Sequence, residues 1–160
     1  MSKSLDRICV PGFKDGLSYV DNVCKEFQEV RDLFVRELKK MDLPLKTLHC
    51  ESGYFMLVDI SACKDLIPSR YKDSHDFEEL KEGEAGVSKN RYFMEDGRVP
   101  LDLAFCRWIA VTRGVLMMPC SFFYHKTSLI KDDRYARIAL CKDMETSVKA
   151  IKRLLLLTSI

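Results

Sequence analysis

The segment GYFMLVDI, residues 53–60, decides the fold of this chain, because it carries the strongest strand signal in the sequence. Ser52 precedes it and Ser61 follows it, so turn residues bound it on both sides. Its apolar residues are continuous rather than alternating, which is typical of a strand that is covered on both faces. We therefore expect an interior strand here, with a sheet built around it.

A long helix is predicted upstream of this strand. Ser18 is a suitable N-cap, and the apolar residues that follow it are spaced by three and four, which predicts one apolar stripe along a helix of about 23 residues. Residues 1–17 contain Pro11, Gly12 and Gly16 and are predicted to be irregular. A helix of this length in a small chain either bridges two domains or covers a sheet. The stripe consists of Val20, Val23, Cys24, Phe27, Val30, Phe34, Leu38 and Met41.

Three shorter strands are expected to complete the sheet. They are Leu45–Cys50, Val115–Met118, which Pro119 ends, and Arg134–Cys141. Between the first two of them, residues 64–100 are rich in Lys, Asp, Glu and Gly, and this composition predicts a surface excursion with one short helix near residues 75–81.

Two more helices follow the excursion. Asp102 is expected to cap the first, which Gly114 closes, and Asp143 is expected to cap the last. The resulting order of elements predicts an α+β fold over residues 18–160, in which a small, mainly antiparallel sheet is covered by helices. A doubly wound parallel sheet is not expected, because strands and helices do not alternate and no Gly-rich phosphate loop follows a strand.

Composition and charge argue against several classes of function. Hydrophobic residues make up 47% and charged residues 31% of the chain, and the formal net charge is only +2. Basic and acidic residues are interleaved, so no nucleic-acid partner is expected. No membrane partner is expected either, because no apolar run approaches the roughly 20 residues of a membrane helix. Residues 1–7 lack the apolar core of a secretory signal.

The cysteines and histidines do not form a metal-binding pattern. The chain has seven cysteines, none of them in a Cys-x-x-Cys pair, and His49, His75 and His125 stand apart from one another. No metal cofactor is therefore expected. Cysteines in apolar surroundings are typical of a reducing compartment, so we expect a cytoplasmic protein, with a mitochondrial location as the alternative.

The run Arg137-Ile138-Ala139-Leu140-Cys141 places a permanent cation inside an apolar, strand-like segment that contains no carboxylate. The guanidinium group presents a fork of donors that fits a carboxylate in a bidentate way. One interpretation is a clamp for the carboxylate of a small substrate. The alternative is an edge-strand arginine that points into water or pairs with Asp132 or Asp133.

Three blocks of this sequence together resemble the kynurenine aminotransferase-like enzymes, which are pyridoxal-phosphate-dependent aminotransferases of class I/II and fold type I. Residues 51–61 (ESGYFMLVDIS) are similar to one strand of these enzymes. Residues 105–124 contain a similar F-x-x-W segment followed by GVLMMPCSFFY, and residues 135–143 (YARIALCKD) resemble the strand before the last helix. The blocks stand in the family's order, and the resemblance runs from about Tyr19 to Leu155 and implies the family's small, C-terminal domain.

The resemblance implies a substrate site for an amino acid or keto acid. Arg137 would bind the α-carboxylate, as the arginine at the matching place does in these enzymes. Gly53, Tyr54, Phe123 and Tyr124 would line the pocket. From the residues alone, Gly53 also reads as a turn residue and the aromatic residues also read as packing.

The resemblance also implies pyridoxal phosphate, but the residues that anchor this cofactor in the family are not found in the sequence. Val87-Ser88-Lys89-Asn90 is the one candidate for the lysine motif, and it lacks the surrounding pattern and lies on the wrong side of the strand at 53–60. We therefore expect the large domain, and the second subunit of the family's homodimer, to be separate from this chain, which would be inactive alone. The alternative is a free-standing, non-catalytic α+β binding or regulatory module.

Overall fold

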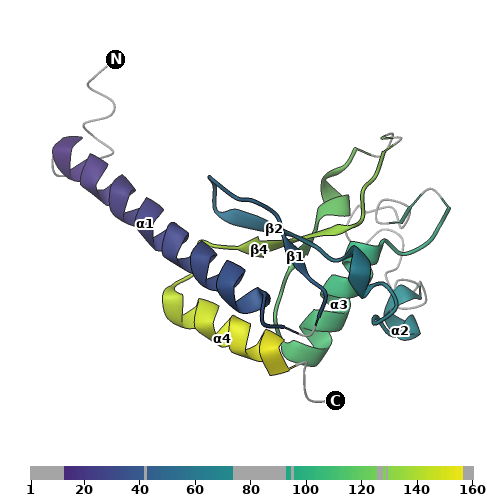
Figure 1. Cartoon of the computed structure of the whole chain (residues 1–160). Coiled ribbons are helices and arrows are strands. Elements are labelled where there is room, and N and C mark those ends of the chain that lie inside the picture. The colour runs from purple at the N-terminus through teal and green to yellow at the C-terminus, as the bar shows by residue number, and fades with distance from the viewer. Residues whose placement is uncertain are drawn as a thin grey trace, which may run out of the picture.

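An antiparallel sheet forms one layer of the domain (Figure 1). The structure is a computed structural model that describes residues 13–41, 43–73, 93–94, 96–125, 128 and 130–156, with side chains from residue 19 onward. Within these residues the sheet has four strands in the order β1-β2-β4-β3, and every neighbouring pair is antiparallel. The strands are β1 (Lys46–Thr47), β2 (Phe55–Asp59), β4 (Tyr135–Ala139) and β3 (Met118–Pro119).

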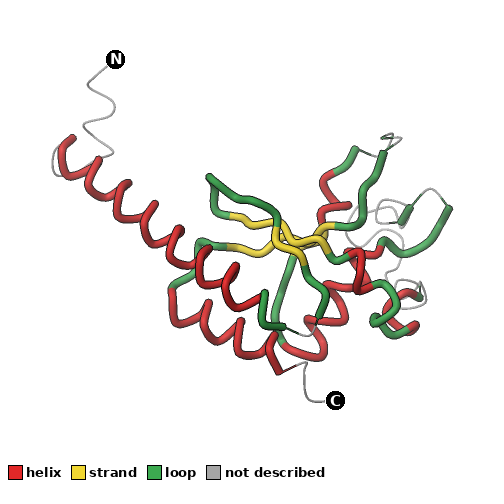
Figure 2. Tube along the Cα trace, viewed as in Figure 1, coloured by secondary structure: helices red, strands yellow, loops and turns green. Residues whose placement is uncertain are grey.

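Helices form the second layer, on one side of the sheet (Figures 1 and 2). The C-terminal part of α1 packs against α4, and α3 packs against β3 and β4. The predicted α+β architecture, a small antiparallel sheet covered by helices, is confirmed. In the described part of the chain, no helix is both long and apolar enough to cross a membrane. The helices are α1 (Phe13–Leu38), α2 (Ser69–Lys72), α3 (Leu101–Arg113) and α4 (Met144–Leu155).

Only one face of the sheet is fully buried. Met56 and Val58 of β2 and Ala136 and Ile138 of β4 point into the core, while the residues between them are half-buried or exposed. The prediction that the strand at 53–60 is covered on both faces is therefore wrong, because its apolar side chains occupy both faces and the helices cover only one of them. The core also takes up buried residues of α1, α3 and α4, among them Val30, Phe34, Leu38, Phe105, Trp108, Ile109, Ile151 and Leu154.

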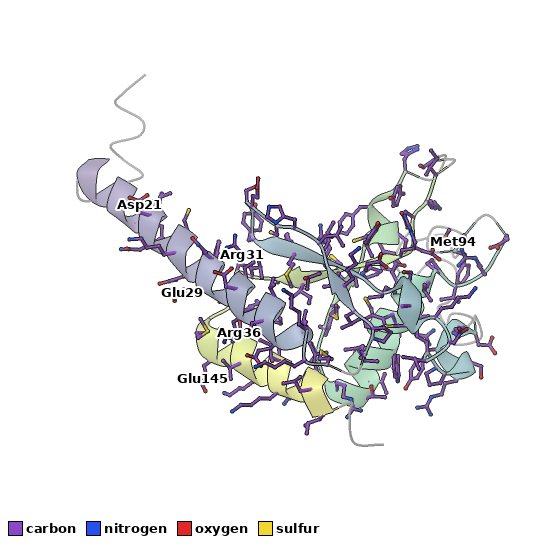
Figure 3. The ribbon with its side chains drawn as sticks, viewed as in Figure 1. Asp21, Glu29, Arg31, Arg36, Met94 and Glu145 are labelled. Atoms are coloured by element: carbon purple, nitrogen blue, oxygen red, sulfur yellow. The ribbon has the colours of Figure 1, made fainter. Side chains whose placement is uncertain are left out.

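Helix α1 is longer than the sequence predicts and leaves part of its apolar stripe uncovered. It already includes Phe13, so the predicted start at Ser18 is wrong, and residues 13–17 are helical rather than irregular. Tyr19 and Val20 are 69% and 53% exposed, and the first turns extend past the rest of the domain (Figure 1). Asp21 lies on this extended part, while Arg31 faces the loop between β1 and β2 (Figure 3). Arg31 donates to the carbonyl oxygen of Cys50 there, at 3.1 Å.

The ends of the later helices follow simple capping chemistry, with one correction. Asp143 caps α4 as predicted, because its carboxylate accepts from the backbone N–H of Thr146 at 2.7 Å. Gly114 closes α3 in the left-handed conformation, with φ 63°. Asp102 is not the cap of α3, since the helix begins one residue earlier, at Leu101. The N–H of Leu101 donates instead to the carboxylate of Asp133, at 2.9 Å, so this cap comes from the chain before β4.

Two other predicted segments differ from the structure. The strand expected at 115–118 is shifted: β3 is Met118–Pro119, and Pro119 is tolerated because β3 lies at the edge of the sheet, where a missing N–H breaks no ladder. The ends of the excursion at 64–100 contribute buried residues to the core, including Ile67, Tyr71 and Val99, so they are not wholly superficial. The short helix expected near residues 75–81 lies outside the described residues.

Substituting Gly114 should test the C-cap of α3. An L-residue in the left-handed region costs roughly 1–2 kcal/mol, so Gly114→Ala should lower the free energy of unfolding by about that amount. The added Cβ meets only the flexible end of Arg153, at 3.1 Å, so steric overlap contributes little. Urea denaturation measures the change. Gly114→Asn is the control, because asparagine tolerates this conformation, and equal losses for both variants would contradict the account.

Candidate functional site

Arg137 lies in the middle of the sheet rather than at its edge. Strand β4 is flanked by β2 and β3, and Arg137 stands opposite Leu57 on one side and Met118 on the other. Because side chains alternate along a strand, and Ala136 and Ile138 point into the core, Arg137 points to the open face of the sheet. The fold therefore places a cation at the centre of the uncovered surface.

Two aromatic rings hold the guanidinium group of Arg137. Its Cζ atom lies 4.3 Å from the ring centroid of Phe55 and 4.0 Å from that of Phe123. Nη2 donates to the sulfur atom of Met118 at 3.0 Å, while Nε is buried and has no hydrogen-bond partner among the described residues. Stacking on a ring face attracts a cation without using its N–H donors. The group is thus fixed in orientation while much of its donor capacity remains unused.

The acidic residues nearest in sequence are engaged elsewhere. Asp132 binds Arg134 through two hydrogen bonds, at 2.9 and 2.7 Å, and these bonds lower the pKa of Asp132. Asp133 accepts from Arg98 at 2.6 Å and from the N–H of Leu101. In the described part of the chain, no carboxylate forms an ion pair with Arg137. Of the alternative interpretation, an edge-strand arginine that points into water or pairs with Asp132 or Asp133, neither the edge position nor the pairing is found among the described residues.

The other predicted pocket residues are divided between two places. Phe123 contacts Arg137 directly, whereas Tyr54 meets the ring of Phe55 edge-on, with centroids 5.4 Å apart. Tyr54 also contacts Phe27 of α1, at 6.4 Å between centroids. These contacts form a row of aromatic rings that runs from α1 to Arg137.

Gly53 and Tyr54 also line a groove of about 350 Å³ between α1 and the β1–β2 loop. Gly53 has φ 83°, and no atom lies within 4 Å of where a Cβ would stand, so the turn explains this glycine without a close ligand. Tyr124 is partly exposed, and its N–H donates to the carbonyl oxygen of Ser121. The structure thus brings Phe123 to Arg137, joins Tyr54 to it through Phe55, and leaves Gly53 and Tyr124 without a contact to the guanidinium group.

Sequence reasoning missed two members of the site, Phe55 and Met118. Phe55 has the same parity as Leu57 in β2, so a period-two reading places both on one face. That reading does not show which residue of a distant strand lies opposite them. The register between β2, β4 and β3 supplies this information, and it arises only on folding.

The described residues do not fit pyridoxal phosphate. A Schiff-base lysine needs an enclosed amine, yet every lysine whose side chain the structure describes is exposed except Lys131. Lys131 is half-buried and donates to the carbonyl oxygen of Phe93. Nor do the described residues gather three or more His, Cys, Asp or Glu side chains that would hold a metal ion. Among the described residues, the site offers a cation and an aromatic surface.

Comparison with solved structures identifies the domain. The chain is similar to Bna3p of Saccharomyces cerevisiae, a protein proposed to be a kynurenine aminotransferase, with 26% identity, a TM-score of 0.63 and coverage of 90% of this chain. It is also similar to YbdL of Escherichia coli, which has a methionine aminotransferase function, with 25% identity, a TM-score of 0.50 and coverage of 81%.

This chain is a fold-type I aminotransferase-like domain. The aminotransferase-like domain also shares its fold with the aspartate aminotransferase of Rhizobium meliloti, at 18% identity and a TM-score of 0.51 over 82% of this chain. It spans only 24% of YbdL, 29% of Bna3p and 25% of the Rhizobium enzyme. No protein-family model matches the sequence, and no curated protein matches it.

Replacing Arg137 by methionine should barely change the stability of this domain. The variant loses two cation–π contacts, worth about 0.5–1 kcal/mol each at an exposed site, and removes a buried unpaired N–H that costs roughly 1–3 kcal/mol. These effects oppose each other, so the free energy of unfolding should change by less than about 1 kcal/mol. Ile138→Ala, at the next position but in the core, should cost about 2–5 kcal/mol. Denaturant titration compares the two, and a large loss in Arg137→Met would indicate a structural role instead.

Proposed function

We propose that this domain is the substrate-carboxylate-binding part of an amino-acid transaminase. Arg137 would bind the α-carboxylate of the amino acid or keto acid, with Phe55 and Phe123 holding the guanidinium plane and Tyr54 extending the apolar surface beside it. The observation that carries this proposal is a guanidinium group held between two rings, with no carboxylate partner among the described residues. A fixed guanidinium group of this kind can accept an external carboxylate through two parallel hydrogen bonds.

The chemistry would require a second structural unit. When bound, pyridoxal phosphate supplies the electron sink for amino transfer, and in this proposal the residues that hold it belong to a large domain or a homologous subunit. Two observations support a partner. The domain spans about a quarter of the aminotransferases it resembles, and the apolar stripe of α1 is uncovered at Tyr19 and Val20. Alone, the domain would orient a substrate without transforming it.

We also propose that the transaminase has kynurenine-type specificity, assembles as a homodimer and is located in the cytoplasm. Similarity to Bna3p and the aromatic row from Phe27 to Phe55 support an aromatic substrate side chain. The described cysteines are free thiols, which supports a reducing compartment, cytoplasmic or mitochondrial. If the domain binds no carboxylate, the alternative applies, which is a free-standing, non-catalytic binding or regulatory module.

Titration with an amino acid should test carboxylate binding directly. L-phenylalanine should shift the side-chain NMR signals of Arg137 with a dissociation constant on the order of 10 mM, because only one charged contact and one ring face contribute. L-phenylalanine amide, which lacks the carboxylate, should leave these signals in place. Arg137→Lys should bind roughly tenfold more weakly, since it keeps the charge and loses the fork. Equal binding of acid and amide would contradict the proposal.

The isolated domain should not capture pyridoxal phosphate. Incubation with the cofactor, reduction with borohydride and mass spectrometry should show no stoichiometric modification of a single lysine, because every described lysine amine but that of Lys131 is exposed. A full-length aminotransferase treated in parallel is the positive control. A stoichiometric adduct on one lysine of this chain would contradict the proposal that a large domain or a homologous subunit holds the cofactor.

A further inference from the structure

Asp102 is a fully buried acid that is hydrogen-bonded to the turn beside the proposed carboxylate site. It is 0% exposed and lies in the first turn of α3. One carboxylate oxygen, Oδ2, accepts from the N–H of Ser121 at 2.6 Å. The other, Oδ1, accepts from the hydroxyl of Ser121 and from the N–H of Leu103, both at 2.8 Å. The side chain thus ties α3 to η5 (Cys120–Phe123), the 3-10 turn that follows β3.

This turn carries the ring that covers Arg137. Phe123 is the last residue of η5, two positions after Ser121, and it stacks on the guanidinium group. Its own side chain is 59% exposed, so burial in the core does little to hold it in place. The backbone of the turn must therefore position the ring. The bonds from Asp102 to Ser121 fix that backbone immediately before Phe123.

We propose that Asp102, through Ser121, is a positioning residue for the carboxylate site and holds Phe123 against the guanidinium group of Arg137. This inference rests on the proposed function for its biological meaning, while the positioning itself is a property of the folded chain. The inference gives a structural reason for the burial of Asp102. This acid forms no ion pair with a described cation, and its removal from water is costly.

The geometry requires both oxygens of Asp102 to be acceptors. Each oxygen faces a backbone N–H, that of Ser121 on one side and that of Leu103 on the other, and backbone donors cannot rotate away. An asparagine amide has only one acceptor oxygen, and a protonated carboxyl carries a hydrogen on one of its two. The asparagine amide therefore sets a donor against one of the two backbone N–H groups. In the protonated carboxyl, the oxygen that carries the hydrogen becomes a poor acceptor, so one of these bonds is weakened and the turn is held less firmly. The position of Phe123 should therefore depend on the charge of Asp102.

The surroundings of Asp102 place its change of charge near pH 6. Burial raises the pKa of Asp102 to about 6, opposed by its bonds to Ser121 and Leu103, and the nearby charge of Asp133 raises it further. The other groups that act in this region are Cys106 on the same helix, Cys120 on the turn and Arg137 beyond it, while Asp133 is itself paired with Arg98. Burial raises the pKa of both thiols, so they stay neutral through this range.

Stability and positioning should respond to pH in opposite directions. The folded chain holds the Asp102 proton more tightly than the unfolded chain does, since the pKa rises from 3.8 to about 6. Ionisation of this group therefore lowers stability as pH rises through that interval. The same ionisation completes the bonds to Ser121. A fall in pH below about 6 should loosen Phe123 while the domain remains folded.

NMR of the whole chain tests this inference without a ligand. The Nε–H signal of Arg137, which lies between two rings, should move toward the position of free arginine in Asp102→Asn and in Ser121→Ala. Ser147→Ala is the matched control, because its buried hydroxyl has no partner among the described residues. Asp143→Asn is the second control, since it disturbs the cap of α4 without touching the start of α3 or η5. Both controls should leave the signal in place.

A pH titration and a ligand titration complete the test. In the unmodified chain the Arg137 signal should change with a midpoint near pH 6, and in Asp102→Asn it should stay flat. Affinity for L-phenylalanine should fall about threefold to tenfold in both variants, as for the loss of one or two hydrogen bonds.

Each outcome decides one of the two proposals. Unchanged Arg137 signals in folded Asp102→Asn and Ser121→Ala, or equal changes in the controls, would overturn the positioning role. If Asp102→Asn does not fold, Ser121→Ala decides, and if neither folds, the pH titration of the unmodified chain decides. A responsive Arg137 signal in a chain that binds no carboxylate would leave the positioning role standing and remove the proposed function.

Discussion

The pairing of β2 with β4 is the constraint on which the rest of this structure depends. It runs in register from Phe55 opposite Ala139 to Asp59 opposite Tyr135 and places Leu57 opposite Arg137. Because side chains alternate, a slip of one residue would turn Arg137 into the core and bring buried residues to the surface. Burial of Met56, Val58, Ala136 and Ile138 against the helices prevents that slip. The hydrophobic face therefore determines where the cation stands, although it makes no contact with a ligand.

The open face shows how the fold assembles the candidate site from residues of three separate segments around Arg137. Phe55 comes from β2, Met118 from β3 and Phe123 from the turn after β3, and they surround a guanidinium group on β4. None of these neighbours is a carboxylate. A cation held by ring faces keeps its N–H donors for an external partner, and its orientation is set before the partner arrives. In the proposed function, such preorganisation suits a domain that binds one end of a substrate while chemistry takes place on another unit.

Two buried carboxylates connect the elements behind this face. Asp133 closes the start of α3 from the chain before β4, and Asp102 joins the same helix turn to η5. Both contacts cross long intervals of sequence, and both use backbone donors that a local residue would ordinarily satisfy. They make the start of α3 a junction between the sheet and the turn that carries Phe123. The capping assignment made from the sequence placed Asp102 in a local role, whereas it binds both its neighbour Leu103 and the distant Ser121.

The sequence by itself determined the class of fold, the place of strand β2 and the position of Arg137 within an apolar strand, because period, capping chemistry and a cation in an apolar run are all local properties. GYFMLVDI specified β2, Asp143 specified the start of α4, and Gly114 specified the end of α3. The tertiary structure alone decided which face of β2 is buried, that Phe55 and Met118 join the site, and that Asp132 and Asp133 are occupied by Arg134 and Arg98. These outcomes depend on register and on contacts between segments far apart in the chain. No local pattern specifies which distant residue becomes the contact partner of a given side chain.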